Sequence, residues 1–121
     1  MSTLLLRIAS IYSLVGVGLG IHMAAQHEFT NKGVHAHANL VGWVSMTLMA
    51  LAYRAFPGLA NTPWARAQFW LHNLGLPVML VGLAALLHGV SWGEPVVGIG
   101  SSVVALAFAS FAINVWRNAH A

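Results

Sequence analysis

The chain has no cysteine among its 121 residues and very little charge of either sign. The lack of cysteine excludes disulfides, thiolate-bound metals, iron–sulfur clusters and covalently attached c-type haem. Only 6% of the residues are charged and 59% are hydrophobic, whereas a soluble domain carries roughly 25% charged residues. Because so few polar side chains cannot cover a soluble surface, the sequence predicts an integral membrane protein with a single domain over residues 1–121.

Several classes of chemistry have no support in the residues. No nucleophile–base pair, phosphate-binding loop or carboxylate pair is visible, so neither hydrolysis nor phosphoryl transfer is indicated. The net charge of +3 comes from few residues and is no signature of nucleic-acid binding. The unusual feature is seven histidines against two acidic residues. Since histidine is the commonest metal ligand among side chains, this balance points to a metal or metallo-cofactor.

Four apolar segments are each close to the ~20 residues that span a bilayer. We therefore expect an all-α bundle of four transmembrane helices, over about residues 4–24, 35–56, 67–88 and 96–116. Pro57 and Gly58 end the second helix, and Pro77 is expected to kink the third. Most basic residues flank the termini and the middle loop, which by the positive-inside rule places both termini in the cytoplasm. The expected location is a bacterial inner (plasma) membrane.

This topology sorts the histidines by depth. His22 ends the first helix, His35 and His37 begin the second, and His88 ends the third, so all four share one layer near the outer side. His72 is expected at the start of the third helix on the opposite side, ~24 Å from His88 at helical rise. We expect His72 to bond near the inner interface, with a quinone site as the alternative.

Two histidines two residues apart in a helix point to nearly opposite sides, because each residue turns about 100°. His35 and His37 are therefore better placed to serve two sites than to grip one ion. Four imidazoles from three apolar helices suit haem b, which needs axial imidazoles and an apolar slot. We rank His37 first as a ligand and His35 next, with His22 and His88 able to pair with them. Asn39, one turn after His35, is expected to orient the His35 ring.

Other interpretations of the same residues stay open. Two or three of these histidines could hold copper or zinc, and histidines near helix ends could simply bond to loop carbonyls or water. Gly16, Gly18 and Gly20 indicate close helix packing or, alternatively, room for a flat cofactor. Tyr53 is expected to join tryptophans 64 and 70 in an interfacial aromatic belt.

Part of the chain resembles a known family. His35-Ala-His37, followed by Asn39, Gly42-Trp43 and an apolar run ending at Pro57, resembles a haem-bearing helix of the haem-copper oxidase catalytic subunits and their nitric-oxide-reductase relatives. Residues 66–75 are similar to the helix that follows in those proteins. The resemblance covers about residues 34–80. It implies that His35 matches the ligand of the active-site haem and His37 the ligand of the low-spin haem.

The resemblance also bears on assembly and activity. The family subunit has twelve helices in three four-helix arcs, so a four-helix relative implies a homotrimer. The expected cofactor is haem b, with copper as a candidate second cofactor. The chain lacks the family's copper-site His-His pair and its tyrosine-linked ligand motif, so the resemblance does not carry over oxygen or nitric oxide reduction.

We therefore expect a b-type haem-binding membrane protein that transfers electrons or binds a diatomic gas such as O2 or NO. If it is an enzyme, it is an oxidoreductase, with a quinone or another respiratory-chain component as its redox partner. A copper- or zinc-binding carrier or sensor is the first alternative. A non-catalytic subunit or assembly factor of a respiratory complex is the second.

Overall fold

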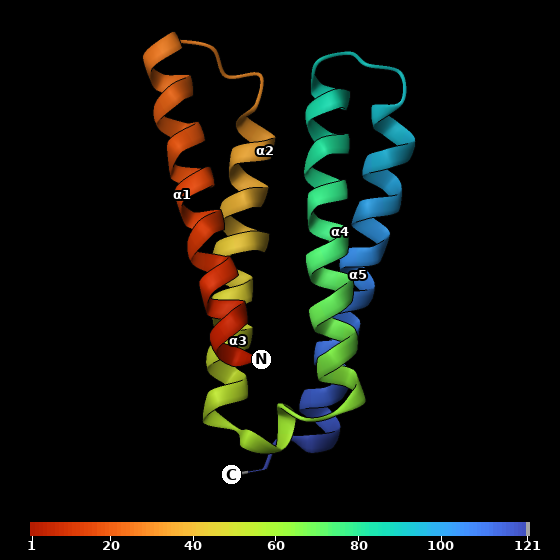
Figure 1. The fold of residues 1–121 in the computed structure, drawn as a ribbon. Helices are drawn as coiled ribbons and strands as arrows, with labels where there is room; N and C mark the ends of the chain where they lie inside the picture. Colours follow the sequence, from red (N-terminus) through yellow and green to blue (C-terminus); the bar gives the residue numbers. More distant parts are fainter. Residues whose placement is uncertain (121) are drawn as a thin grey trace.

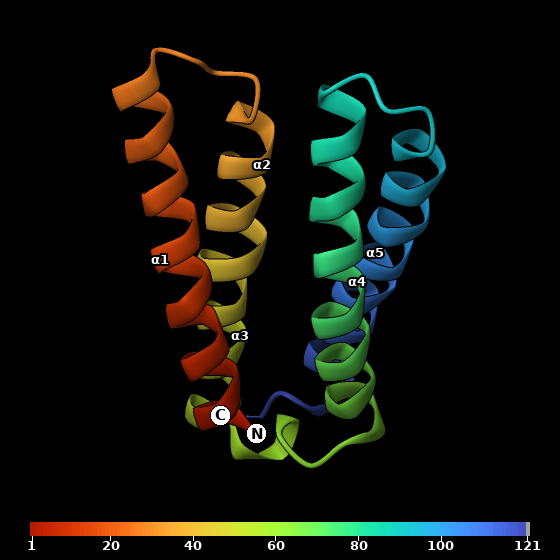
Figure 2. The ribbon, with the colours of Figure 1, turned by 45° about the horizontal axis from the view of Figure 1, so that its top comes forward.

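The computed structural model describes residues 1–120, which form two antiparallel helical hairpins standing side by side (Figure 1). The first hairpin pairs α1 (Ser2–Gln26) with a second rod made of three consecutive pieces. The second hairpin pairs α4 (Pro63–Leu87) with α5 (Gly93–Asn118). The start of α1 and the end of α5 lie at the same end of the bundle as the connection into α4 (Figures 1 and 2).

The second rod is the one interrupted helix among the four. It consists of α2 (Lys32–His37), the π-helix η1 (Ala38–Val44) and α3 (Ser45–Ala55). The short 3-10 turn η2 (Pro57–Leu59) follows it, in agreement with the expected stop at Pro57. A π-helix bonds each N–H to the carbonyl five residues back, which widens the turn and is uncommon outside functional sites. The sequence pattern predicted one regular helix here, and the π-helix was not foreseen.

The prediction of an all-helical fold with four helical rods is confirmed, but within residues 1–120 the interrupted second rod is not among the helices long and apolar enough to cross a membrane. Helices α1, α4 and α5 are each long and apolar enough to cross a membrane, with mean hydropathies of 1.9, 1.7 and 2.2 over their most apolar windows. Their ends extend two to four residues beyond most of the predicted bounds. Helix α4 begins at Pro63 with a Thr62 cap on the Ala65 N–H, and it continues through Pro77 as one helix. Many large apolar side chains face outward, as a lipid environment requires.

Helices α4 and α5 approach each other almost backbone to backbone. A Cβ added at Gly82 would lie 2.3 Å from Val97 N, and one added at Gly100 would lie 2.3 Å from Met79 N. Only glycine permits this distance, which is how small residues bring membrane helices together. Gly100, in the glycine-rich first turns of α5, is one of these small residues.

Polar side chains join the hairpins at the end where α3 leads into α4. Asn114 on α5 donates from Nδ2 to the Leu59 carbonyl at 3.0 Å, and its Oδ1 accepts from the Thr62 hydroxyl at 3.0 Å. Asn114 is fully buried, so these bonds satisfy a side chain that would otherwise be costly to bury. They tie the connection between the hairpins to the last turns of α5.

Tyr53 does not belong to an aromatic belt. It is only 2% exposed, and its hydroxyl donates to Gln68 Oε1 at 2.8 Å. The prediction of an interfacial tyrosine was wrong because Tyr53 faces α4 and α5, where Phe111 packs edge-on against its ring. Trp70 is exposed, as an interfacial or lipid-facing residue should be.

Candidate functional site

The structure places His22, His35, His37 and His88 toward the same end of the bundle, where the α1–α2 and α4–α5 connections lie (Figure 1). His22 belongs to the last turns of α1, His35 and His37 belong to α2, and His88 follows α4 directly. These four histidines nevertheless differ in their exposure to solvent. His35 is half-buried, whereas the other three are exposed.

His35 is held between α2 and α1. Its Nδ1 donates to the Gly16 carbonyl at 2.6 Å, because a carbonyl can only accept. The ring lies against Gly20, where an added Cβ would come within 2.8 Å of Cε1. Glycines four residues apart on α1 therefore make room for this imidazole. The packing interpretation of Gly16 and Gly20 fits the structure, and Gly18 faces open space.

Asn39 lies against the same ring. Its Nδ2 is 3.2 Å from His35 Nδ1, but Nδ1 already gives its hydrogen to Gly16 and has no lone pair for the amide. The amide also fills the space above Gly16, where an added Cβ would meet Oδ1 at 2.3 Å. Asn39 thus fixes the ring mainly by contact. Within residues 1–120, its Oδ1 is a buried side-chain atom without a hydrogen-bond partner.

His37 is oriented differently. Its Nδ1 donates to the carbonyl of Gly33, one turn earlier in the same helix, at 2.7 Å. This bond puts the hydrogen on Nδ1 and leaves the lone pair on Nε2. The side chain is exposed, so Nε2 is presented at the surface of the bundle. An imidazole with Nδ1 on a backbone carbonyl and Nε2 free has the arrangement that metal-binding histidines adopt.

His22 and His88 belong to a polar cluster at the loop end. His88 donates from Nε2 to Asn31 Oδ1 at 3.0 Å, which links the two hairpins at this end. A hollow of about 330 Å³ lies beside them, lined by His22, Met23, Gln26, Glu28 and Asn31. The hollow is open and polar, so it suits water or a small hydrated group better than a large apolar cofactor.

The Glu28 carboxylate caps the α1–α2 loop. It accepts from both the hydroxyl and the backbone N–H of Thr30, and these bonds, aided by the charges of His88 and His22, lower its pKa. A lowered pKa stabilises the folded loop above the usual value of about 4.3, and this stabilisation is lost as the pH falls through the folded-state pKa. We expect Thr30→Val to raise the Glu28 pKa toward that usual value. Carboxyl chemical shifts measured by NMR across an acid titration test this, and an unchanged pKa in the variant would contradict it.

The histidines do not form a classical metal site within one chain. Among residues 1–120, no group of three histidine, cysteine or acidic side chains is close enough to hold one metal ion. His35 turns toward α1 and His37 toward the surface, as their two-residue spacing predicted. A single chain therefore presents His35 and His37 to different surroundings and not to one shared metal ion.

His72 is the histidine that the fold buries completely. Helix α4 begins at Pro63, so His72 lies near the middle of the helix and not at its start as expected. Its Nε2 donates to the Val41 carbonyl of η1 at 2.9 Å, and Gln68 Nε2 donates to its Nδ1 at 3.0 Å. With the Tyr53 hydroxyl donating to Gln68, a continuous chain of hydrogen bonds runs from α3 through α4 to the π-helix.

This chain of bonds ends on the π-helix. His72 donates to the Val41 carbonyl, and the Ser45 hydroxyl donates at 2.6 Å to the Leu40 carbonyl, which also accepts the Ser45 backbone N–H. The π-helix starts directly after His37, so the bonds that hold it also fix the part of the rod that carries the candidate ligand. This role of His72 could not be predicted from the sequence, although an imidazole inside an apolar helix always needs a partner.

We expect His72→Leu to lower the free energy of unfolding by about 2 kcal/mol, because the Val41 carbonyl and the Gln68 amide lose their partner in an apolar core. Unfolding by sodium dodecyl sulfate in mixed micelles measures it. His88→Leu removes an exposed histidine with one hydrogen bond, and serves as the matched control with a loss within about 0.5 kcal/mol. Equal losses of unfolding free energy for both variants would contradict the structural role assigned to the buried hydrogen bonds of His72.

Comparisons with protein-family models, curated proteins and solved structures find no match to this chain.

Proposed function

We propose that this protein is a membrane-embedded binder of haem b, with His37 as its first axial ligand. The observation that supports this most directly is the state of the His37 ring, whose Nδ1 is bonded to the Gly33 carbonyl at 2.7 Å. The bond selects the tautomer with a free Nε2 lone pair, and it makes that nitrogen a stronger donor to iron. The exposed position leaves room for a large group in front of it.

The histidines of this chain suit haem better than a copper or zinc ion bound by protein ligands alone. A porphyrin supplies the equatorial ligands itself, so haem iron needs only one or two imidazoles from protein. Zinc sites take three or four protein ligands, and residues 1–120 bring no three candidate ligands together. The absence of cysteine excludes an axial thiolate and leaves imidazole, thioether and tyrosine oxygen as the axial donors in the chain. These facts favour haem over the copper or zinc alternative.

A haem bound by His37 would lie on the outer surface of the bundle. Hollows of 190, 220 and 330 Å³ lie in the chain, and none of them is lined by His35 or His37. A haem on His37 would therefore lie between this surface and a second copy of the chain, which would supply the opposite wall and the second imidazole. We propose a homotrimer, because residues 34–80 resemble two consecutive helices of a family subunit whose helices form three arcs around a pseudo-threefold axis.

Bound haem iron supplies one-electron transfer when both axial positions are filled, and gas binding when one stays open. The chain contributes the rest. The Gly33 carbonyl holds the His37 ring, the π-helix and His72 hold the segment that follows it, and the apolar helices exclude water. The activity we propose is electron transfer or diatomic-gas binding in a membrane.

The test is an optical spectrum of the detergent-purified chain, oxidised and then reduced with dithionite, with haem quantified as the pyridine haemochrome. We expect a Soret band, a sharp α band on reduction, and haem b in stoichiometric proportion to the chain. A folded protein that is colourless, and that takes up no added hemin, would contradict the proposal. Metal analysis for copper and zinc on that sample would then test the alternative.

A further inference from the structure

Both acidic residues lie at one end of the molecule, together with Lys32, whereas the opposite end carries arginines. The chain has two acidic residues, Glu28 and Glu94, and both lie at the end of the α1–α2 and α4–α5 connections. Arg54 and Arg66 lie at the opposite end, beside the α3–α4 connection. No acidic side chain of this chain can neutralise them there. Arginines at a membrane surface without protein partners attract anionic lipid headgroups.

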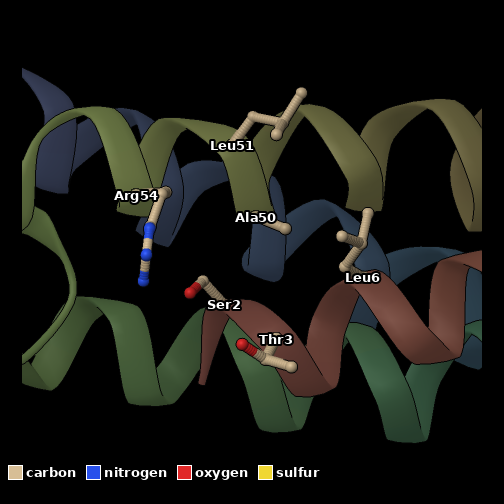
Figure 3. Close-up of a pocket in the computed structure, with 6 residues that line it drawn as sticks. All are labelled: Ser2, Thr3, Leu6, Ala50, Leu51 and Arg54. Carbon is tan, nitrogen blue, oxygen red and sulfur yellow. The ribbon is translucent and has the colours of Figure 1, made fainter.

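One of these arginines borders a hollow of about 190 Å³ between the start of α1 and the end of α3. Figure 3 shows Arg54 reaching from α3 toward α1, with the hydroxyls of Ser2 and Thr3 facing the same space and Leu6 at the far end. Ala50 and Leu51 complete the lining. The hollow thus has a cationic and hydroxyl-bearing end, and an apolar end directed along the bundle.

A second hollow nearby also has one arginine in its lining, but no hydroxyl group. It measures about 220 Å³ and lies against the first turn of α1 on the side of α4, lined by Met1, Leu4, Arg66, Phe69 and Trp70. It also joins one arginine to apolar walls. Two hollows at this end of the bundle therefore each combine an arginine with apolar side chains.

We propose that the Arg54 hollow binds one anionic phospholipid. Its phosphate would pair with the Arg54 guanidinium and accept hydrogen bonds from the Ser2 and Thr3 hydroxyls. The start of an acyl chain would lie against Leu6 and Leu51. Charge complementarity selects the anionic headgroup, and the apolar half of the hollow selects a lipid over a free anion. This site is independent of the haem proposal, because it lies at the other end of the bundle from His37.

The experiment uses the full chain in phosphatidylcholine vesicles that contain a small fraction of spin-labelled phosphatidylglycerol. The fraction of immobilised label reports bound lipid. We expect Arg54→Gln to weaken the preference for phosphatidylglycerol roughly tenfold, because the charge-assisted hydrogen bond between the guanidinium and the phosphate in the hollow is lost. Leu6→Trp keeps every charge but fills the apolar end, and we expect it to weaken the preference as well.

Arg117→Gln is the matched control. Arg117 is also near this end, but its guanidinium lies 5.6 Å from the Trp64 ring centroid and outside the hollow. It should leave the preference nearly unchanged. Equal losses for Arg54→Gln and Arg117→Gln would show a general surface-charge effect and overturn the site. No loss for Arg54→Gln, or displacement of the lipid by inorganic phosphate, would overturn it too. Circular dichroism of each variant checks that the helices are intact.

Discussion

His37→Ala should purify as a folded protein that has lost its haem. The His37 side chain is exposed, and its hydrogen bond to Gly33 lies within one helix, so its removal costs the fold little. It removes the nitrogen to which we assign the iron. Haem-to-chain ratios by pyridine haemochrome should fall at least tenfold, because the first axial ligand sets most of the affinity.

His120→Ala is the control for this loss. His120 is exposed and follows the end of α5, away from the proposed ligand layer, so its haem content should equal that of the unmodified chain. The same measurement on alanine variants of His22, His35 and His88 identifies the second ligand. A His37→Ala protein with full haem content and an unchanged spectrum would refute the assignment.

Gly100→Ala should separate α4 from α5 and lower the stability of the fold. The new methyl group would lie 2.3 Å from Met79 N and 2.6 Å from Met79 Cα. These are backbone atoms, so the helices must move apart and lose packing along their length. Overpacking of this kind lowers the free energy of unfolding by roughly 1–3 kcal/mol or more. The better helix propensity of alanine offsets only ~1 kcal/mol of this loss. We expect a net loss of about 1 kcal/mol, and of up to about 2 kcal/mol if the cost lies at the upper end of that range.

Gly98→Ala provides the comparison on the same helix, two residues away. An added Cβ there meets nothing within 4 Å. It should be neutral or stabilise the helix by up to ~1 kcal/mol. Unfolding of both variants in mixed micelles measures the difference. If Gly100→Ala is as stable as Gly98→Ala, the close backbone contact between α4 and α5 is not present in the protein.

The helices themselves could be predicted from the sequence because length and hydropathy decide them. Twenty or so apolar residues bounded by polar loops can only be a helix in a membrane, whatever its neighbours are. The depth of each histidine follows from its place along such a segment. This is why His22, His35, His37 and His88 were expected in one layer, and why they lie at one end of the bundle.

The direction of each side chain could not be predicted in the same way. The π-helix of 38–44 depends on donors from outside it, and the main one, His72, comes from another hairpin. A hydropathy pattern contains no information about such a bond. Tyr53 was expected at an interface for the same reason, since only the approach of Gln68 makes a buried position favourable for its hydroxyl.

Native mass spectrometry of the chain released from detergent tests the central proposal most directly, because it counts chains and cofactor in one measurement. We predict an assembly of three chains, each of 12.9 kDa, that carries the additional mass of haem b and loses it on collisional activation without breaking a covalent bond. Single chains with no haem, from a preparation whose helices are intact, would contradict the account.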